Sequence, residues 1–567
     1  MNVSEYIVDR LIKHGVTDTF GVPGGVILKL LYAMQDRFTE ITPHLNYHEQ
    51  MAGFAACGYA QAGNKLGVAY ATRGPGITNM ITCMAESYQE SLPVLFITAH
   101  GNRRESVLRY EFDQELELTQ SVSRFTKYSA NVDDINDVVE KLEEACRIAM
   151  DGRKGPVFLD FSSKLFDMEM NENHICKCEK KQYSKNINLQ ECNVINLIRK
   201  YISKSKRPII LIGDGMRKVE KIVKDSEYFN NLGIPILSSR GAHDILSKSE
   251  YYFGYIGSHG NRYSNFILSK TDLIICIGNR LSFPVDSKSF APIVENATVI
   301  RLDVDEAEFL RKIPNSINHK IDVDDFINEL IKSKLKFEDR FGWIDVCKIL
   351  KEKLDDYDLT VPVKKLSNIL RNIQENVTYV CDVGNNEFWF SRAYELIRPD
   401  GNVLYSKSFG TVGSALGRSI GAYYASEKDV ICVIGDQGFQ YNLQELQYIA
   451  YWNIPIKIIL LNNTCSGMIA DHENEIFPNK YVHVNPENGY SVPDFEKIIK
   501  AYGIKYVYYE DINDIEINTI FSQSVPMVYE IQYDSKISLV PNLPKGNLCQ
   551  KMEPGIEEQL YEFLEEL

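Results

Sequence analysis

Residues 431–446, ICVIGDQGFQYNLQEL, and residues 456–463, IKIILLNN, decide the fold of this chain. Each stretch contains an apolar run typical of a buried parallel strand, and residues 443–451 between them have room for a helix. Asp436 and Asn463 follow the two strands, at the edge where open α/β sheets usually bind ligands. A carboxylate, an amide oxygen and a loop carbonyl suit Mg²⁺, which in turn binds phosphate oxygens. The two stretches therefore predict a diphosphate anchor, although an ordinary Gly-Asp turn would explain the first one alone.

The composition excludes several classes of function. The chain has 567 residues and a net charge of −15, which argues against a nucleic-acid-binding surface. No apolar run is long enough to span a membrane, and residues 1–15 read as an amphipathic helix rather than a secretory signal. The 12 cysteines include no CxxC pair, which favours reduced, buried thiols in a cytoplasmic protein.

Alternating apolar strands and amphipathic helices predict an α/β protein with three doubly wound parallel-sheet domains. We expect these domains at residues 1–165, 190–335 and 360–540, with a tail at 541–567. Polar stretches at residues 172–189 and 332–358 read as connections. Strands of the second domain are expected at residues 208–212, 273–277 and 297–302. The tail should form a helix that packs on its own protein through Ile556, Leu560, Phe563, Leu564 and Leu567.

The spacing of the opening stretches resembles the thiamine diphosphate motif of the thiamine-diphosphate-dependent enzymes, in which GDG precedes NN. The third residue of this motif is Gln437 here instead of Gly, which changes the loop where the backbone approaches the phosphates. The resemblance implies that Asp436, Asn463 and the carbonyl of Cys465 bind Mg²⁺.

Residues 46–60, NYHEQMAGFAACGYA, continue the resemblance in the first domain, together with residues 67–82 and 91–98. These stretches resemble the pyrimidine-binding domain of acetolactate synthases. A lone Glu is usually a solvated charge, but the resemblance implies that Glu49 hydrogen-bonds the aminopyrimidine and promotes proton transfer within the cofactor. The small residues after Glu49 suit close helix packing. Further cofactor contacts are implied at Pro23, Gly24, Gly25, Thr72, Gly74 and Asn79.

In the third domain, residues 382–389, DVGNNEFW, and residues 406–422, SKSFGTVGSALGRSIGA, resemble the family's other cofactor-binding segments. A Gly-Asn turn would be the purely structural explanation of the first. The resemblance implies that the carbonyl of Gly410 accepts from the cofactor's amino group and that Val412, where relatives usually carry Met, keeps the cofactor bent. The implied cofactor contacts are Asn385, Asn386, Gly410, Val412, Gly435, Asp436, Gln437, Gly438 and Met468.

The reaction branch is suggested by residues 110–118, YEFDQELEL, which lack the His pair that simple thiamine decarboxylases commonly use for protonation. An unprotonated intermediate can attack a second carbonyl, which favours a carboligase. Gln114 aligns with the glutamine that lies beside the reacting carbon in acetolactate synthases, although an exposed helix residue is the alternative. Lys127, 13 residues later, is the remaining catalytic candidate.

The second domain contains glycine-rich strand ends at residues 213–215, 257–260 and 277–280, and an acidic stretch at residues 301–308. Each is a common turn by itself, but their order resembles the FAD-binding domain of acetolactate synthases. The implied FAD contacts are Gly213, Asp214, Gly215, Ser258, His259, Gly260, Gly278, Arg280, Asp303 and Asp305. A domain that kept the scaffold and lost the flavin is the alternative.

Departures from the family gather around the acceptor, where Asp113, Pro284 and His472 replace residues that select a second 2-oxoacid. We therefore expect decarboxylation of a 2-oxoacid, most simply pyruvate, and transfer of the hydroxyethyl carbanion to a nucleotide-linked keto-sugar, as in branched-sugar carboligases. The alternatives are an acetolactate synthase with pyruvate or 2-oxobutyrate as acceptor, a pyruvate oxidase, and a non-enzymatic paralogue. The resemblance also implies a site between two subunits, and hence a homodimer or homotetramer.

Overall fold

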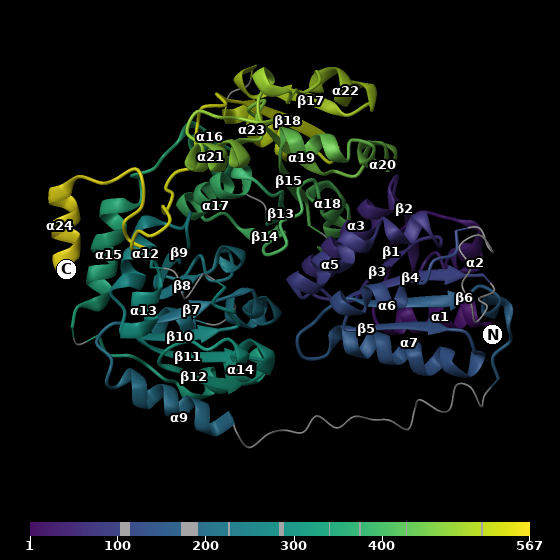
Figure 1. Cartoon of the computed structure of the whole chain (residues 1–567), viewed down its shortest axis with the longest axis horizontal. Coiled ribbons are helices and arrows are strands. Elements are labelled where there is room, and N and C mark those ends of the chain that lie inside the picture. The colour runs from purple at the N-terminus through teal and green to yellow at the C-terminus, as the bar shows by residue number, and fades with distance from the viewer. Residues whose placement is uncertain are drawn as a thin grey trace.

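Three α/β domains surround a common centre in the computed structural model (Figure 1). The structure describes residues 1–567 except 102–113, 172–190, 225–226, 283–287, 340, 374–375, 427 and 512–513. Each domain is built on a six-stranded sheet whose described strand pairs are all parallel. The predicted fold class is therefore confirmed, and the five apolar runs predicted as strands in the second and third domains all form strands.

The first sheet has the order β2-β1-β3-β4-β6-β5. The order in which successive strands are added reverses between the parallel strands β1 and β3, so the loops after these two strands line a crevice at the carboxyl edge. The strands are β1 (Asp18–Gly21), β2 (Thr42–Leu45), β3 (Gly67–Tyr70), β4 (Val94–His100), β5 (Tyr128–Val132) and β6 (Val157–Ser162). The helices are α1 (Val3–Lys13), α2 (Leu28–Asp36), α3 (Glu49–Gly63), α4 (Pro75–Thr78), α5 (Ile81–Glu90), α6 (Thr119–Val122) and α7 (Ile135–Met150).

The second sheet has the order β12-β11-β10-β7-β8-β9, which is the order of dinucleotide-binding folds. Its switch point lies between β7 and β10, and the glycine-rich turns predicted at residues 213–215 and 277–280 follow these two strands. The strands are β7 (Pro208–Ile212), β8 (Ile236–Ser238), β9 (Tyr252–Tyr255), β10 (Leu273–Ile277), β11 (Thr298–Asp303) and β12 (Ser316–Lys320). The helices are α9 (Glu191–Ile202), α10 (Glu220–Lys224), α11 (Tyr228–Asn231), α12 (Arg262–Ser269), α13 (Ala291–Asn296), α14 (Val323–Ser333) and α15 (Trp343–Leu354).

The third sheet, β14-β13-β15-β16-β18-β17, repeats the strand order of the first when strands are counted from the start of each domain. Its switch point lies between β13 and β15. The strands are β13 (Val377–Cys381), β14 (Gly401–Tyr405), β15 (Val430–Gly435), β16 (Lys457–Asn462), β17 (Lys505–Tyr508) and β18 (Met527–Gln532). The helices are α16 (Val361–Asn372), α17 (Asn385–Ile397), α18 (Ala415–Ser426), α19 (Asp436–Tyr441), α20 (Glu445–Tyr451), α21 (Gly467–Ile476), α22 (Phe495–Ala501) and α23 (Asp514–Phe521).

The first and third domains share one hydrophobic core across helices α3 and α18. A Cβ on Gly421 would lie 1.8 Å from the carbonyl oxygen of Ala55, and one on Gly58 would lie 2.1 Å from that of Arg418. Glycine therefore allows the two backbones to approach directly, as the small residues after Glu49 predicted. Arg418 also pairs with Glu86, and both side chains are fully buried. This seam fixes the first domain relative to the third.

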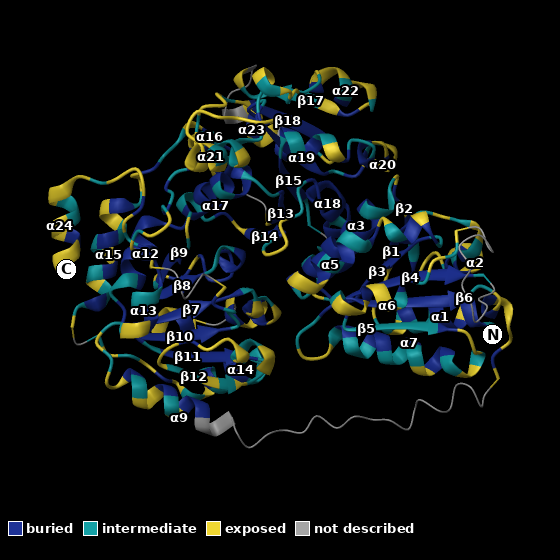
Figure 2. Cartoon of the chain, viewed as in Figure 1, coloured by how far each residue is buried: buried dark blue, intermediate teal, exposed yellow. Residues whose placement is uncertain are grey.

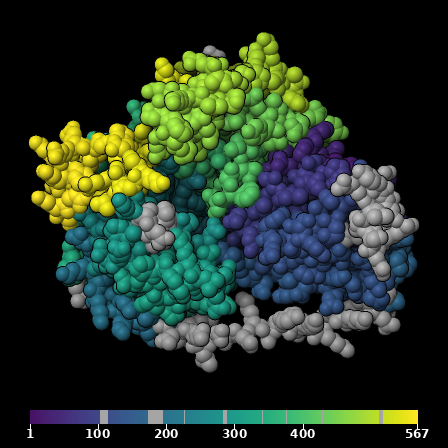
Figure 3. Space-filling model, viewed as in Figure 1, coloured from purple at the N-terminus to yellow at the C-terminus, as the bar shows by residue number. Residues whose placement is uncertain are grey.

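The C-terminal tail packs on the second domain, where Figure 3 shows it in yellow. Helix α24 (Glu558–Glu566) buries Leu564 and packs Ile556, Leu560 and Leu567 against the core, as predicted. Phe563 is the exception, because 45% of it is exposed. Helix α15 joins the same core, although we expected only a charged connection between residues 332 and 358.

The buried residues in Figure 2 follow the three sheets and the helices between them. The free cysteines among the described residues are all buried, as predicted. In the part of the chain that the structure describes, no helix is both long and apolar enough to cross a membrane.

Candidate active site

Glu49 is the first residue of α3 and lies at the carboxyl edge of the first sheet. The preceding His48 caps the helix, because its ring accepts a hydrogen bond from the Gln50 amide at 3.1 Å. The Asn79 amide donates to Glu49 Oε2 at 2.9 Å, and a Cβ on Gly76 would lie 3.4 Å from Glu49 Oε1. The structure thus brings Glu49 together with Asn79, which sequence reasoning had assigned to the cofactor.

The other residues predicted in the first domain gather around the same crevice. A Cβ on Gly24, after β1, would lie 2.4 Å from the Thr72 side chain, after β3. One on Gly74 would lie 2.6 Å from the carbonyl oxygen of Gln114, so Gln114 is held beside this loop. Pro23 and Gly25 are exposed at the same edge.

Lys127 lies at the end of a helix, and its catalytic role stays a prediction. Its ammonium donates to the carbonyl oxygen of Asp151 at 2.7 Å and to that of Ile148. These carbonyls lie at the carboxyl end of α7, where a cation stabilises the helix dipole. Residues 102–113, including Asp113, lie outside the described residues.

Asp436 and Asn463 lie at the ends of neighbouring strands β15 and β16. Asp436 Oδ1 accepts from the Gln437 amide at 2.9 Å, while Oδ2 is buried with no hydrogen-bond partner among the described residues. Burial raises the pKa of Asp436 to about 7. Asn463 Oδ1 accepts from the Cys465 amide at 3.2 Å. An unsatisfied buried carboxylate beside an amide oxygen and a loop carbonyl fits a bound cation.

This oxygen set differs from a site made of acidic, His or Cys side chains, and no cluster of three such residues suited to a metal occurs in the described ranges. Gln437 adopts ordinary helical backbone in α19. Its side chain accepts a hydrogen bond from Ser466 Oγ at 2.8 Å and donates one to the Tyr441 hydroxyl at 3.3 Å. The missing motif glycine therefore costs no backbone strain here.

The loop after β13 lies across the switch point from Asp436. A Cβ on Gly435 would lie 3.3 Å from Asn386 Oδ1, and one on Gly467 would lie 3.1 Å from Asn385 Nδ2. Asn385 begins α17 without a side-chain cap, so the first amides of this 13-residue helix point into the crevice. Met468, in the first turn of α21, lies next to Gly467.

Asp382 organises this edge, and sequence reasoning did not identify its role. Its two carboxylate oxygens accept from the amides of Gly413 (2.8 Å) and Ala415 (3.1 Å). A Cβ on Gly438 would lie 2.1 Å from Asp382 Oδ2, which explains why the residue after Gln437 is glycine. Asp382 therefore ties the loop that carries Val412 to the start of α19. A buried acidic residue at a strand end was the available signal.

A cavity of about 500 Å³ lies at the centre, between the second domain and parts of the other two. None of the residues assigned above to thiamine diphosphate lines this cavity. Nine of the predicted FAD residues line it: Gly213, Asp214, Gly215, Ser258, His259, Gly260, Gly278, Arg280 and Asp303. Its size falls within the range of nucleotide and cofactor sites.

Asp305 is the exception, because it is not among the residues that line the cavity, and its contact with FAD stays a prediction. It caps the turn at Ala307 and pairs with Arg153 of the first domain at 2.9 Å. Arg153 also pairs with Asp303 at 3.2 Å, so these carboxylates join two domains at the cavity rim. His259 reaches the carbonyl of Pro541 at 3.3 Å, and its ring lies against Phe388.

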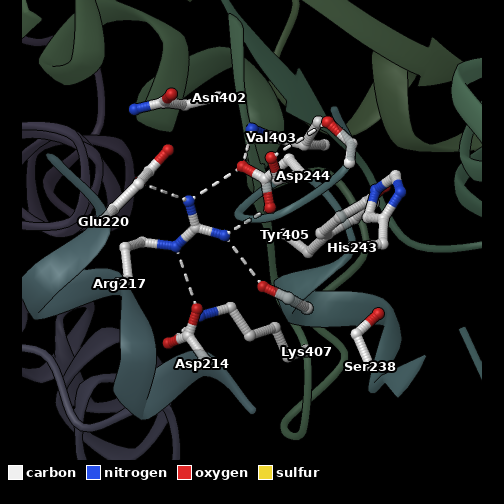
Figure 4. Close-up of polar contacts among 12 residues, drawn as sticks. Asp214, Arg217, Glu220, Ser238, His243, Asp244, Asn402, Val403, Tyr405 and Lys407 are labelled. Carbon is white, nitrogen blue, oxygen red and sulfur yellow. Dashed lines mark hydrogen bonds and ion pairs between the residues drawn. The ribbon is translucent and has the colours of Figure 1, made fainter. Parts of the chain in front are cut away.

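Asp214 belongs to a cluster centred on Arg217 (Figure 4). Arg217 pairs with Asp214 at 3.0 Å, with Glu220 at 3.3 Å and with the fully buried Asp244 at 2.8 Å. Lys407 of the third domain pairs with Asp214 as well. The motif's aspartate therefore connects two domains, in a network that its glycine-rich surroundings did not reveal.

Comparison with known families agrees with this three-domain arrangement. The N-terminal TPP binding domain of thiamine pyrophosphate enzymes matches residues 1–121, and their central domain matches residues 195–330. Their C-terminal TPP binding domain matches residues 382–530.

Relatives match over nearly the whole chain. The acetolactate synthase large subunit of Pyropia yezoensis is 31% identical, over 88% of this chain and 86% of that protein. The large subunit of Cyanidium caldarium is 29% identical over 98% and 97%, and isozyme 2 of Escherichia coli is 28% identical over 96% and 98%. The chain therefore belongs to the thiamine pyrophosphate enzymes, as an acetolactate synthase-like member that contains all three of their domains.

Proposed function

We propose that this enzyme decarboxylates pyruvate and joins the resulting two-carbon unit to the carbonyl carbon of a second 2-oxoacid, as an acetolactate synthase does. The observation that carries the proposal is the pair of half-sites, with Glu49 at one sheet edge and Asp436 and Asn463 at another, in a chain whose relatives of similar length are named acetolactate synthases.

Mg²⁺ and the diphosphate of the cofactor would be held in the third domain. Asp436 Oδ2, Asn463 Oδ1 and the Cys465 carbonyl would provide oxygen ligands for Mg²⁺. The unsatisfied buried oxygen of Asp436 supports this assignment, because only a cation or a proton would neutralise it there. The first amides of α17, with Asn385 and Asn386, would donate to the phosphate oxygens.

The aminopyrimidine would lie between the Gly410 carbonyl, which accepts from its amino group, and Glu49, which hydrogen-bonds its ring nitrogen. Val412 and Met468 would supply apolar contacts. When bound, thiamine diphosphate supplies a carbon nucleophile and stabilises the electron pair released with CO₂. Asn79 orients the Glu49 carboxylate for its proton transfer, a contribution that typically reaches about 10²–10⁴-fold.

We propose that the central cavity binds FAD. The dinucleotide-binding strand order and the cavity lining support this assignment. Gly257, whose φ is +132°, has nothing within 4 Å of the Cβ position, so backbone is open to a ligand there. A flavin would supply a two-electron redox centre, which carboligation does not require. Use of those electrons would instead make the protein a pyruvate oxidase.

A homodimer would complete the active site. Asn79 and Gly76, which are the neighbours of the Glu49 carboxylate, belong to the same domain as Glu49. Large apolar side chains are exposed in both of these domains: Leu45 (44%) and Tyr47 (47%) before α3, and Tyr451 (73%) and Trp452 (57%) at the end of α20. Such exposure supports an interface with a second copy of the chain.

The relatives favour a 2-oxoacid acceptor over the keto-sugar that we expected. Of the three residues behind that expectation, Asp113 and Pro284 lie outside the described residues. His472 lies on α21, with 66% of its side chain exposed.

Mass spectrometry of the products from labelled pyruvate tests the proposal, with Mg²⁺, thiamine diphosphate and a panel of 2-oxoacids, aldehydes and nucleotide keto-sugars. We expect acetolactate as the main product. Preferential formation of a keto-sugar adduct would contradict the proposal of a 2-oxoacid acceptor. Acetate formation with oxygen uptake would indicate a pyruvate oxidase. Failure to release CO₂ from any 2-oxoacid would reject the reaction itself.

A further inference from the structure

Residues 405–409, here called the junction segment, lie where the three domains meet. The segment leaves β14 of the third domain and leads directly to Gly410. From the second domain, Arg280 donates to Ser408 Oγ at 2.5 Å, and Asp214 pairs with Lys407. From the first domain, Gln61 donates to the carbonyl of Tyr405 at 3.4 Å.

Glu90 of the first domain makes the contacts that fix the backbone of the junction segment. It is the last residue of α5 and is only 6% exposed. Its Oε1 accepts from the amide of Ser408 at 2.5 Å and from that of Phe409 at 3.0 Å. Two amides converging on one carboxylate oxygen form charge-assisted hydrogen bonds, which are stronger than neutral ones.

The contacts of the second domain differ in kind. Arg280 and Asp214 hold the side chains of Ser408 and Lys407, which can rotate without moving the backbone. Glu90 instead holds two successive peptide groups, so it determines the direction in which the chain enters the next turn.

That turn carries the predicted pyrimidine contacts. Ser406 Oγ accepts from the amides of Gly410 and Thr411, both at 3.1 Å, so the turn closes back on the junction segment. Gly410 has a φ of +74°, and nothing lies within 4 Å of its Cβ position. Gly410 is also exposed, so few packing contacts restrain its backbone. The orientation of its carbonyl therefore depends on the hydrogen bonds on either side.

We propose that Glu90 is a positioning residue for thiamine diphosphate: it holds the junction segment so that the Gly410 carbonyl and Val412 face the pyrimidine. This inference rests on the proposed function, in which those two groups contact the cofactor. Glu90 is not among the residues assigned to thiamine diphosphate, although it lines the central cavity. It acts from a domain other than the one whose loop it holds.

Calorimetric titration of the full-length protein with thiamine diphosphate at saturating Mg²⁺ tests the proposal, alongside thermal unfolding. Glu90→Ala removes both hydrogen bonds and should raise the Kd for thiamine diphosphate roughly tenfold or more. Glu90→Gln keeps an oxygen acceptor and should stay within about threefold of the wild type. Glu90→Asp, whose carboxylate is withdrawn, should lie between them.

Glu143→Ala is the matched control, because Glu143 is a half-buried carboxylate of the same domain that pairs with Arg10 and His14, away from the junction segment. It should lower the unfolding temperature and leave the Kd unchanged. If Glu90→Ala does not fold, the same Kd comparison between Glu90→Asp and Glu90→Gln decides the matter.

Wild-type affinity in Glu90→Ala, or in Glu90→Asp if that variant stands in for it, would overturn this inference alone. A Kd that rises equally in Glu143→Ala would also overturn it, because loosening of the domain would then explain both results. Failure of the wild type to bind thiamine diphosphate would overturn the proposed function, and this inference with it.

Discussion

The first and third domains have the same strand order, yet the acidic residue at the proposed site of each domain differs in its hydrogen bonding. In the first domain Glu49 starts a 15-residue helix and already accepts a hydrogen bond from Asn79. In the third domain Asp436 starts a short helix, and one of its oxygens is buried without a hydrogen-bond partner in the described part of the chain. One fold therefore supplies a carboxylate that is already hydrogen-bonded through a side chain and another that has a buried oxygen left for a cation or a proton.

The difference arises from strand position. Glu49 follows β2, an edge strand, whereas Asp436 follows β15, which has strands on both sides. A central strand end lies deeper, so burial dominates the electrostatics and raises the pKa of Asp436. We expect Glu49, after the edge strand, to take part in proton transfer, and Asp436, after the central strand, to hold the cofactor in place.

Asp436→Ala should have the largest effect on activity. Removing the one carboxylate among the proposed Mg²⁺ ligands should lower turnover by more than about 10³-fold and abolish Mg²⁺-dependent binding of thiamine diphosphate. Steady-state kinetics and calorimetry would measure the two effects. Asp400→Ala, at an exposed aspartate of the same domain, should leave both unchanged. Retained Mg²⁺-dependent binding in Asp436→Ala would contradict the distinction between the two half-sites.

Glu49→Gln should lower turnover by about 10²–10⁴-fold, because the amide cannot take part in the same proton transfer. Cofactor affinity should change little, since Glu49 is assigned to chemistry rather than retention. Turnover and Kd measured on one preparation would separate these roles. A large loss of affinity with normal turnover at saturation would reverse our assignment.

The pH dependence of stability should reveal Glu445, a buried carboxylate of the third domain that contacts the first domain. Burial raises the pKa of Glu445 to about 7, while its carboxylate accepts from the Asn46 side chain and the Tyr47 amide. The folded protein therefore binds a proton that the unfolded chain releases above about pH 4. Its contribution to the free energy of unfolding should fall by up to about 1.4 kcal/mol per pH unit between pH 4 and 7.

Denaturant unfolding at several pH values would measure that slope. Glu445→Gln keeps only one of the two acceptor oxygens but does not titrate, so its stability should fall less over the same pH range, whatever its absolute value. Equal slopes in the wild type and Glu445→Gln would show that this carboxylate is ordinary in the folded protein.

Gly421→Ala tests whether the seam sets the relative position of the two domains. The new Cβ would clash with the carbonyl of Ala55, and such overpacking typically costs about 1–3 kcal/mol. Denaturant unfolding would give this value. Gly555→Ala is the control, because nothing lies within 4 Å of its Cβ position. A fully stable Gly421→Ala would mean that α3 and α18 separate easily.

Lys127→Met should have the smallest effect. Loss of the cation at the end of α7 should reduce stability by about 0.3–1 kcal/mol. Turnover should stay within about twofold of the wild type, because this residue lies outside both half-sites. A fall in turnover of tenfold or more would support the catalytic role of Lys127.

The sequence predicted best where a local pattern determines the structure. Apolar runs such as residues 208–212 and 273–277 coincide with strands, because both faces of a central parallel strand are buried. Asp436 and Gly213, which the motifs placed at switch points, directly follow strands β15 and β7. Their positions could be predicted because the apolar run before each of them marks the strand.

Side-chain partners from distant segments were harder to predict. Asp305 was assigned to a flavin, but Arg153 reaches it from another domain. Helix α15 read as a charged connection, because its apolar face, with Trp343, Cys347 and Leu350, is narrow and flanked by lysines. Glu90 carried no local signal, since its partners are backbone amides more than 300 residues away.

The tail has a practical consequence for anyone who handles this protein. Arg262 is buried and donates to the carbonyls of Met552 and Pro554 while pairing with Asp358. Removing the chain after β18 would deprive that buried guanidinium of two acceptors. It would also expose the apolar core of the second domain on which α24 packs. An affinity tag is therefore better attached at the amino end, and a short C-terminal deletion is a poor choice for improving crystals.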